Sequence, residues 1–247
     1  MADNTKLAKP AELAPWELEL AKEARDETAK ESTGADRITH KSGVIKLDGK
    51  PVADNKLPMA IIDYGMAKAY YADDYEEGVA ATPACYAFGR DEADMKPHEL
   101  SPDKQASTCA ECPHNKFGTA ERGRGKRCKD ERRVMAFVGT SDLDSLQKAE
   151  MRMLAIPPGS LKNWAKYLRT VRDVTPTGNV RTVITELGTE PLKGAYALTF
   201  KATEKLDGAF VQGLLSRRAT AEEQMFAPYP TIDVEERPRK KRNSKIE

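Results

Sequence analysis

Four cysteines in the middle of the chain constrain its fold more than any other feature. They are Cys85, Cys109, Cys112 and Cys128, and the chain has no other cysteine. The middle two form a C-x-x-C pair, whose two-residue gap lets a tight turn aim both sulfurs at one point about 2.3 Å from a Zn²⁺ ion. One further cysteine on each side would complete a tetrahedral set of thiolates. The spacing therefore predicts a four-cysteine structural metal site, with zinc favoured over an iron–sulfur cluster.

The complete ligand set is less strongly determined than the central pair. The arms that join the pair to the outer cysteines are 23 and 15 residues long. Cys85 and Cys128 are alternatively small core residues, and His114 is an alternative ligand. The segment 82–129 contains few apolar residues and many prolines and glycines. A bound metal would supply folding free energy where hydrophobic burial does not.

Positive charge is concentrated around the last cysteine. Between Arg122 and Arg133, seven basic and two acidic residues give a local charge of +5, in a chain whose total is +1. Arginine suits phosphate recognition, and the glycines at 123 and 125 let a ligand approach the backbone. The segment is not a P-loop, because the spaced first glycine and the Ser/Thr after the lysine are missing. We expect nucleic-acid contact here, with a solvated loop as the alternative. The residues expected to bind phosphates are Arg122, Arg124, Lys126, Arg127, Lys129, Arg132 and Arg133, and those expected to stack on bases are Tyr86, Phe88 and Phe117.

Length and composition predict one main domain. The chain has 247 residues, 39% of them hydrophobic and 32% charged, and no apolar run approaches the roughly 20 residues that a membrane span requires. The N-terminus lacks the apolar region of a signal peptide. We therefore expect no membrane association and a cytoplasmic, reducing location, where thiolates bind metal rather than form disulfides.

Hydrophobic periodicity predicts an α+β fold. Strands are expected over 44–47, 59–62, 134–138, 151–156, 180–187 and 195–201. A helix is expected over 161–171, with Ser160 as its N-cap and Trp164 facing the core, and a final helical stretch over 208–226. An OB-type barrel has the order strand, strand, strand, helix, strand, strand. The expected elements follow this order with one extra strand.

The predicted organisation is an OB-like β-barrel core over 37–226, with the metal module inserted at 82–129 and flexible termini. Residues 1–36 form a charged arm, in which Trp16 and Leu20 lie on one face of a short amphipathic helix. This helix either docks on a replication or host protein or is part of a solvated arm. Residues 227–247 form a basic tail, which binds phosphates, acts as a localisation signal or is simply solvated.

Three stretches of the sequence resemble a known group of proteins. They are the knuckle from Cys109 to Gly118, the basic stretch from Gly123 to Arg133, and the Ile156 to Leu161 turn with the Trp/Tyr helix that follows. Together they resemble a group of tailed-phage zinc-knuckle proteins of poorly defined function, over about residues 85–200. In architecture the chain also resembles the single-stranded-DNA-binding proteins of T-even phages, which combine an OB fold with an inserted zinc site. The resemblance implies a protein of the host cytoplasm.

The leading hypothesis is a protein that binds single-stranded DNA in phage replication or recombination. The rival is an adaptor or inhibitor that holds a host protein through the zinc module and the N-terminal helix. We do not expect an enzyme, because no convincing nucleophile–base pair is found and the histidines are only three: His40, His98 and His114.

Overall fold

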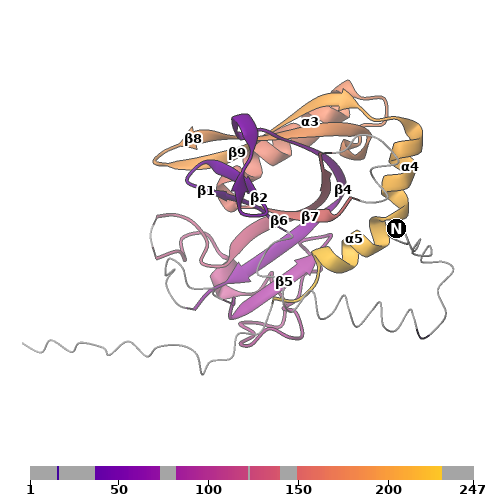
Figure 1. The fold of residues 1–247 in the computed structure, drawn as a ribbon. Coiled ribbons are helices and arrows are strands. Elements are labelled where there is room, and N and C mark those ends of the chain that lie inside the picture. The colour runs from indigo at the N-terminus through magenta and orange to yellow at the C-terminus, as the bar shows by residue number, and fades with distance from the viewer. Residues whose placement is uncertain (1–15, 17–36, 73–81, 122, 140–148, 230–247) are drawn as a thin grey trace, which may run out of the picture.

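The computed structural model describes residues 16, 37–72, 82–121, 123–139 and 149–229. Nine strands within these residues form one curled sheet (Figure 1), in the order β3-β2-β1-β7-β6-β4-β8-β9, with β5 paired to β4. The strands are β1 (Arg37–Lys41), β2 (Val44–Leu47), β3 (Lys50–Pro51), β4 (Leu57–Tyr70), β5 (Cys85–Gly89), β6 (Lys129–Val138), β7 (Met151–Ile156), β8 (Val183–Leu192) and β9 (Ala195–Lys205). Within residues 37–229 the described α-helices are α3 (Leu161–Val174), α4 (Gly208–Ser216) and α5 (Arg218–Met225), and 3-10 turns lie at Ala53–Asn55, Pro113–Asn115, Pro158–Ser160 and Val180–Thr182.

The long strand β4 connects the two ends of the molecule. Figure 1 shows it bending through the structure, with β8, β9 and α3 at one end and β5 with the cysteine loop at the other. In β4, Met59 and Ile61 pack into one cluster of buried residues, whereas Ala60 and Ile62 pack into another. Side chains alternate between the two faces of a strand, so β4 is buried on both faces. The continuous apolar run over residues 59–62 fits this position.

One face of the sheet packs against α3. Trp164, Tyr167 and Val171 are the buried face of this helix, and Trp164 meets Tyr64 of β4 edge to face at a centroid distance of 5.3 Å. The prediction that Trp164 is a core residue is confirmed. Ser160 precedes the helix as predicted but makes no capping hydrogen bond; its hydroxyl accepts the Leu198 N–H of β9 at 2.8 Å instead.

The other face packs against α4 and α5. Phe210 and Leu214 of α4 and Met225 of α5 are buried with Phe137 of β6. The sequence predicted one helical stretch here; the structure divides it at Arg217, which is the C-cap of α4 and the N-cap of α5. Among the described residues, no helix is long and apolar enough to cross a membrane.

A buried carboxylate joins helix α5 to β4. Asp63 follows a bulge in β4 and is fully buried. It accepts hydrogen bonds from Arg90 at 2.6 Å and from Arg218 of α5 at 3.0 Å, and it pairs with Arg181. Burial alone would raise the pKa of Asp63, but the hydrogen bonds from Arg90 and Arg218 outweigh it and hold the pKa well below its usual range.

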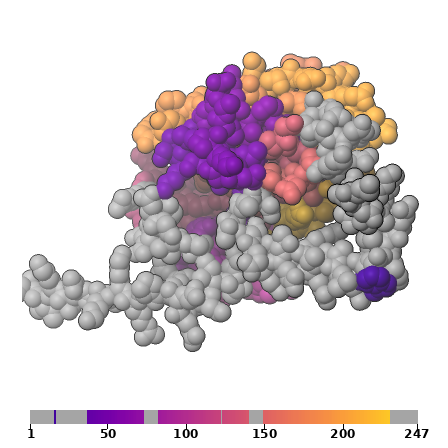
Figure 2. All heavy atoms as spheres, viewed as in Figure 1, coloured from indigo at the N-terminus to yellow at the C-terminus, as the bar shows by residue number. Residues whose placement is uncertain are grey.

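The α+β class is confirmed, but closure into an OB-like barrel is not. The sheet is a half-barrel, since β3 and β9 end its path and are not paired with each other within the described residues. The N-terminal strands β3, β2 and β1, violet in Figure 2, form one end of the sheet path, and β1 runs parallel to β7. Strands β1, β3 and β5 were not predicted. Apart from Trp16, the arm 1–36 lies outside the described residues, as do 230–247.

Candidate metal centre and nucleic-acid interface

The topology of β4 brings the two outer cysteines together. Tyr70, the last residue of β4, is paired with Cys85 of β5, and the neighbouring Ala69 is paired with Lys129 of β6 on the other side. Cys128 directly precedes Lys129. Residues 85 and 128, far apart in sequence, therefore flank the same end of one strand.

The C-x-x-C pair lies on the loop between β5 and β6. Cys109 N–H donates to the Met95 carbonyl at 2.9 Å and Cys128 N–H to the His114 carbonyl at 2.9 Å. The Asn115 amide donates to the Cys109 carbonyl at 2.8 Å. These bonds join separate parts of the loop to one another.

All four cysteines are buried, free and in contact with one cavity. The cavity has a volume of about 10 Å³, and its lining includes Cys85, Cys109, Cys112 and Cys128. About 10–15 Å³ is the space that one water molecule needs, so the cavity is no larger than that. The four residues are all thiols, all are buried and all line the same cavity, as the predicted four-cysteine set requires. His114, the alternative ligand, does not line this cavity; its ring stacks on Tyr70 at 4.3 Å.

Metal binding at this site requires the thiols to ionise and move closer together. Burial raises the pKa of Cys109 to about 11 and that of Cys128 to about 12, so both are neutral thiols at pH 7. Among the described residues, no three His, Cys, Asp or Glu side chains converge closely enough to hold a metal as they stand. A metal would displace the protons and draw the sulfurs inward to bonding distance.

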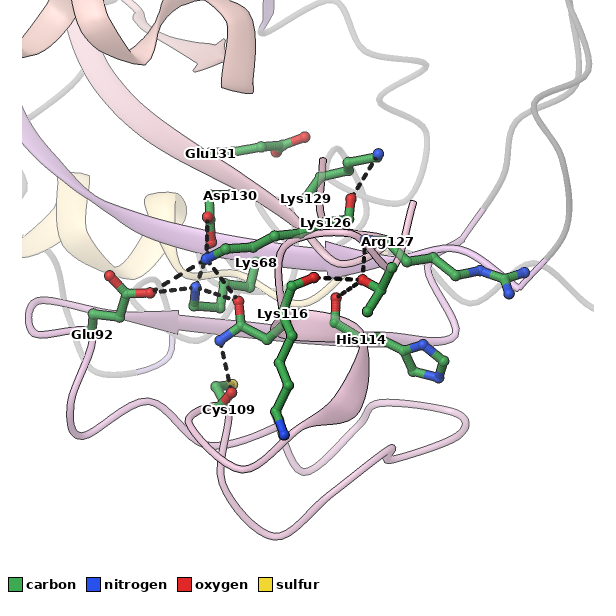
Figure 3. A network of polar contacts seen from close by, with 12 residues as sticks. Lys68, Glu92, Cys109, His114, Lys116, Lys126, Arg127, Lys129, Asp130 and Glu131 are labelled. Carbon is green, nitrogen blue, oxygen red and sulfur yellow. Dashed lines mark hydrogen bonds and ion pairs between the residues drawn. The ribbon is translucent and has the colours of Figure 1, made fainter. Parts of the chain in front are cut away.

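A polar network that the sequence analysis did not find lies beside the cavity (Figure 3). Lys68 of β4 is 3% exposed and its ammonium group pairs with Asp130 and with Glu92 at 2.8 Å. Burial opposes the charge of Lys68, but hydrogen bonds to Asp130 and Glu92 raise its pKa. This cation lowers the pKa of Cys109 and Cys128, against the larger effect of burial. The sequence signal that could have revealed this network is Lys68, a charged residue within the largely apolar strand β4.

Several of the predicted phosphate-binding residues are already engaged within the protein. Lys126 binds Asp130 at 2.8 Å and Arg127 binds Glu121 at 2.8 Å. Arg133 is buried; it donates to the Met225 carbonyl at 2.7 Å and its guanidinium lies 4.0 Å from the centroid of Phe88. Arg133 thus joins the segment after α5 to the sheet, and in this position its side chain is buried; its role as a phosphate contact stays a prediction.

The other basic residues are more accessible. Arg124 and Lys129 are exposed and Arg132 is half-buried. The Lys129 ammonium donates to the Lys126 carbonyl and the Arg132 guanidinium donates to the carbonyl of its neighbour Glu131. Arg122 lies outside the described residues. The accessible positive charge of this segment is therefore smaller than its sequence indicates.

The three aromatic residues proposed for base stacking differ in accessibility. Tyr86 is 2% exposed and packs against His98 and Tyr229, so it offers no open ring face to a base. The contact with Tyr229 also places the beginning of the predicted tail against the core. Phe88 is half-buried, with Arg133 over its ring. Phe117 is 80% exposed, and the Lys126 ammonium lies 5.1 Å from its centroid.

Comparisons of the chain with protein families, with curated proteins and with solved structures found no match.

Proposed function

We propose that this protein binds single-stranded DNA, in phage replication or recombination in the host cytoplasm, and does so without catalysis. The observation that carries the proposal is Phe117. It is 80% exposed, more than any other large hydrophobic residue within the described parts of the chain. An aromatic ring that is exposed next to cations is the usual platform on which single-stranded bases stack.

The surroundings of Phe117 fit this role. Lys126 lies over its ring, and the exposed Lys116 and Arg124 belong to the same loop. Each base stacked on such a ring contributes about 1–3 kcal/mol, and the cations add a salt-dependent attraction to phosphates.

We propose further that Cys85, Cys109, Cys112 and Cys128 hold a structural zinc ion. Bound zinc would supply the folding free energy that this loop does not obtain from a hydrophobic core. Phe117 and Lys126 lie between Cys112 and Cys128, so fixing these two ligands fixes the loop that presents the ring. The same proposal includes the predicted OB-like barrel, of which the observed half-barrel would be a part.

A titration of fluorescent oligo-dT at two salt concentrations tests the function. We expect Phe117→Ala to weaken binding by about 1–3 kcal/mol at both. Leu100→Ala is the matched control: Leu100 is also exposed, at 63%, and lies in the same module, but it has no aromatic ring. Absence of binding by the unaltered protein at low salt, or equal losses for the two variants, would contradict the proposal.

The second candidate is an adaptor or inhibitor that binds a host protein. It is favoured by the two large apolar side chains, Leu100 and Phe117, that the module exposes. Protein capture that survives nuclease treatment and is lost in Leu100→Ala would support this candidate over DNA binding.

A further inference from the structure

Helix α3 carries a ridge of cations on the face opposite to its buried side. Lys162, Lys166 and Arg169 follow one another at intervals of four and three residues and are exposed, whereas Trp164 and Val171 face the core. Residues at these intervals lie about 5–6 Å apart on one face of a helix. The ridge therefore runs along the exposed side of α3.

The charge of this ridge is available to a ligand. No carboxylate within the described residues pairs with Lys162, Lys166 or Arg169, and Arg172 pairs with its exposed neighbour Asp173 at 3.0 Å. Four cations and one carboxylate leave α3 with a net charge of +3. In the cysteine module, by contrast, Lys126 and Arg127 are held in ion pairs.

An open cavity of about 210 Å³ lies beside the ridge. Its lining includes Tyr64 of β4, Leu168, Arg169 and Arg172 of α3, and Asn179. Tyr64 is half-buried and is held in place by Trp164, whose ring is nearly perpendicular to it at a centroid distance of 5.3 Å, and by the Arg181 guanidinium, 5.5 Å from its centroid. The cavity thus combines a fixed aromatic ring with two cations at its rim.

We infer that α3 and this cavity form a second contact for single-stranded DNA. The phosphates follow Lys162, Lys166 and Arg169, and one base enters the cavity and stacks on Tyr64. A duplex is disfavoured, because its bases are stacked on each other and cannot enter. This inference rests on the proposed function but uses different residues, at the end of the molecule away from β5 (Figure 1).

Salt-dependent titrations of the full chain with oligo-dT test the ridge. Each phosphate contact to a single strand contributes about 0.7 to the slope of log K against log salt. We expect Lys166→Gln with Arg169→Gln to reduce that slope by about 1.4. The control Lys201→Gln with Lys205→Gln removes the same charge from exposed positions of β9. It should reduce the salt slope by less than half of the reduction expected for the α3 variant. Equal reductions would overturn the inference.

Substitutions of Tyr64, whose ring lines the cavity, test whether a base stacks there. Tyr64→Phe keeps the stacking surface and should bind normally, whereas Tyr64→Leu should lower affinity by roughly five- to 150-fold. Photo-crosslinking of the unaltered protein to an oligonucleotide containing 4-thiothymidine checks the site without a substitution, and residue 64 should carry the crosslink. Crosslinks elsewhere, with full affinity in Tyr64→Leu, would overturn it.

The outcomes separate this inference from the proposed function. If the unaltered protein does not bind oligo-dT, both fail. If Phe117→Ala weakens binding while the α3 and Tyr64 variants behave as their controls, the proposed function stands and the α3 contact does not exist.

Discussion

Replacing Asp63 by asparagine is the most direct test of how the fold is held together. The substitution removes one negative charge and keeps the shape of the side chain and one oxygen for the Tyr64 N–H, which Asp63 binds at 2.9 Å. It leaves three guanidinium groups, those of Arg90, Arg181 and Arg218, around a neutral amide.

The expected loss follows from the burial of these groups. Breaking a buried ion pair by removing one partner costs about 3–5 kcal/mol. Asp63 is fully buried and the Arg181 side chain is 13% exposed, so their pair belongs to this class. Arg90 and Arg218 are more than a third exposed and can regain water, and surface pairs contribute little. We therefore expect a loss of about 3 kcal/mol, the lower end of the range.

Urea unfolding followed by tryptophan fluorescence measures this loss. Asp173→Asn is the control, because Asp173 pairs with Arg172 on the exposed surface of α3 and its loss should stay within about 0.5 kcal/mol. The hydrogen bonds that lower the pKa of Asp63 stabilise the folded state while the carboxylate is charged. That stabilisation is present above about pH 4 and is lost as the pH falls, so the two proteins should converge in acid. A loss below 1 kcal/mol at pH 7, or a gap that does not narrow, would refute the reasoning.

Two further predictions concern the metal and the packing of the C-terminal segment. Purified protein should contain about one zinc per chain by elemental analysis, and Cys128→Ser should lose the zinc and open the cysteine loop to proteolysis. A metal-free protein that is folded and resists proteolysis would reject the site. Iron in place of zinc would indicate an iron–sulfur cluster. Gly65→Ala should cost about 1–3 kcal/mol in urea unfolding, because its Cβ would lie 2.6 Å from the Phe226 ring. The control Gly208→Ala meets nothing within 4 Å and should not destabilise; equal effects of the two would contradict the packing argument.

Local patterns in the sequence were sufficient to predict most of the elements. The strand over 151–156 and the start of the helix at residue 161 agree with β7 and α3, because hydrophobic periodicity and a Pro-Pro-Gly turn are local signals. The short strand β5 was missed. It takes its hydrogen bonds from β4, and that pairing is not encoded in the five residues themselves.

The candidate metal site was predicted more fully than the candidate DNA contacts. Cysteine spacing specifies ligand chemistry, and the structure brings all four residues to one cavity. Counting basic residues, by contrast, does not show which charges are already paired. A count of basic residues includes Arg133, yet its guanidinium is buried against the rings of Phe88 and Tyr229.

The sequence by itself determined the α+β class, the four-cysteine cluster and the amphipathic helix α3, since each depends on residue type and spacing along the chain. The tertiary structure alone decided that the sheet is a half-barrel, that Asp63 gathers three arginines, and that Lys126 and Arg127 are ion-paired beside the cysteines, whereas no carboxylate within the described residues pairs with Lys162, Lys166 or Arg169 on α3. These features depend on contacts between residues far apart in sequence. The free energy of a charge depends on its burial and its partners, and both are set only when the chain folds.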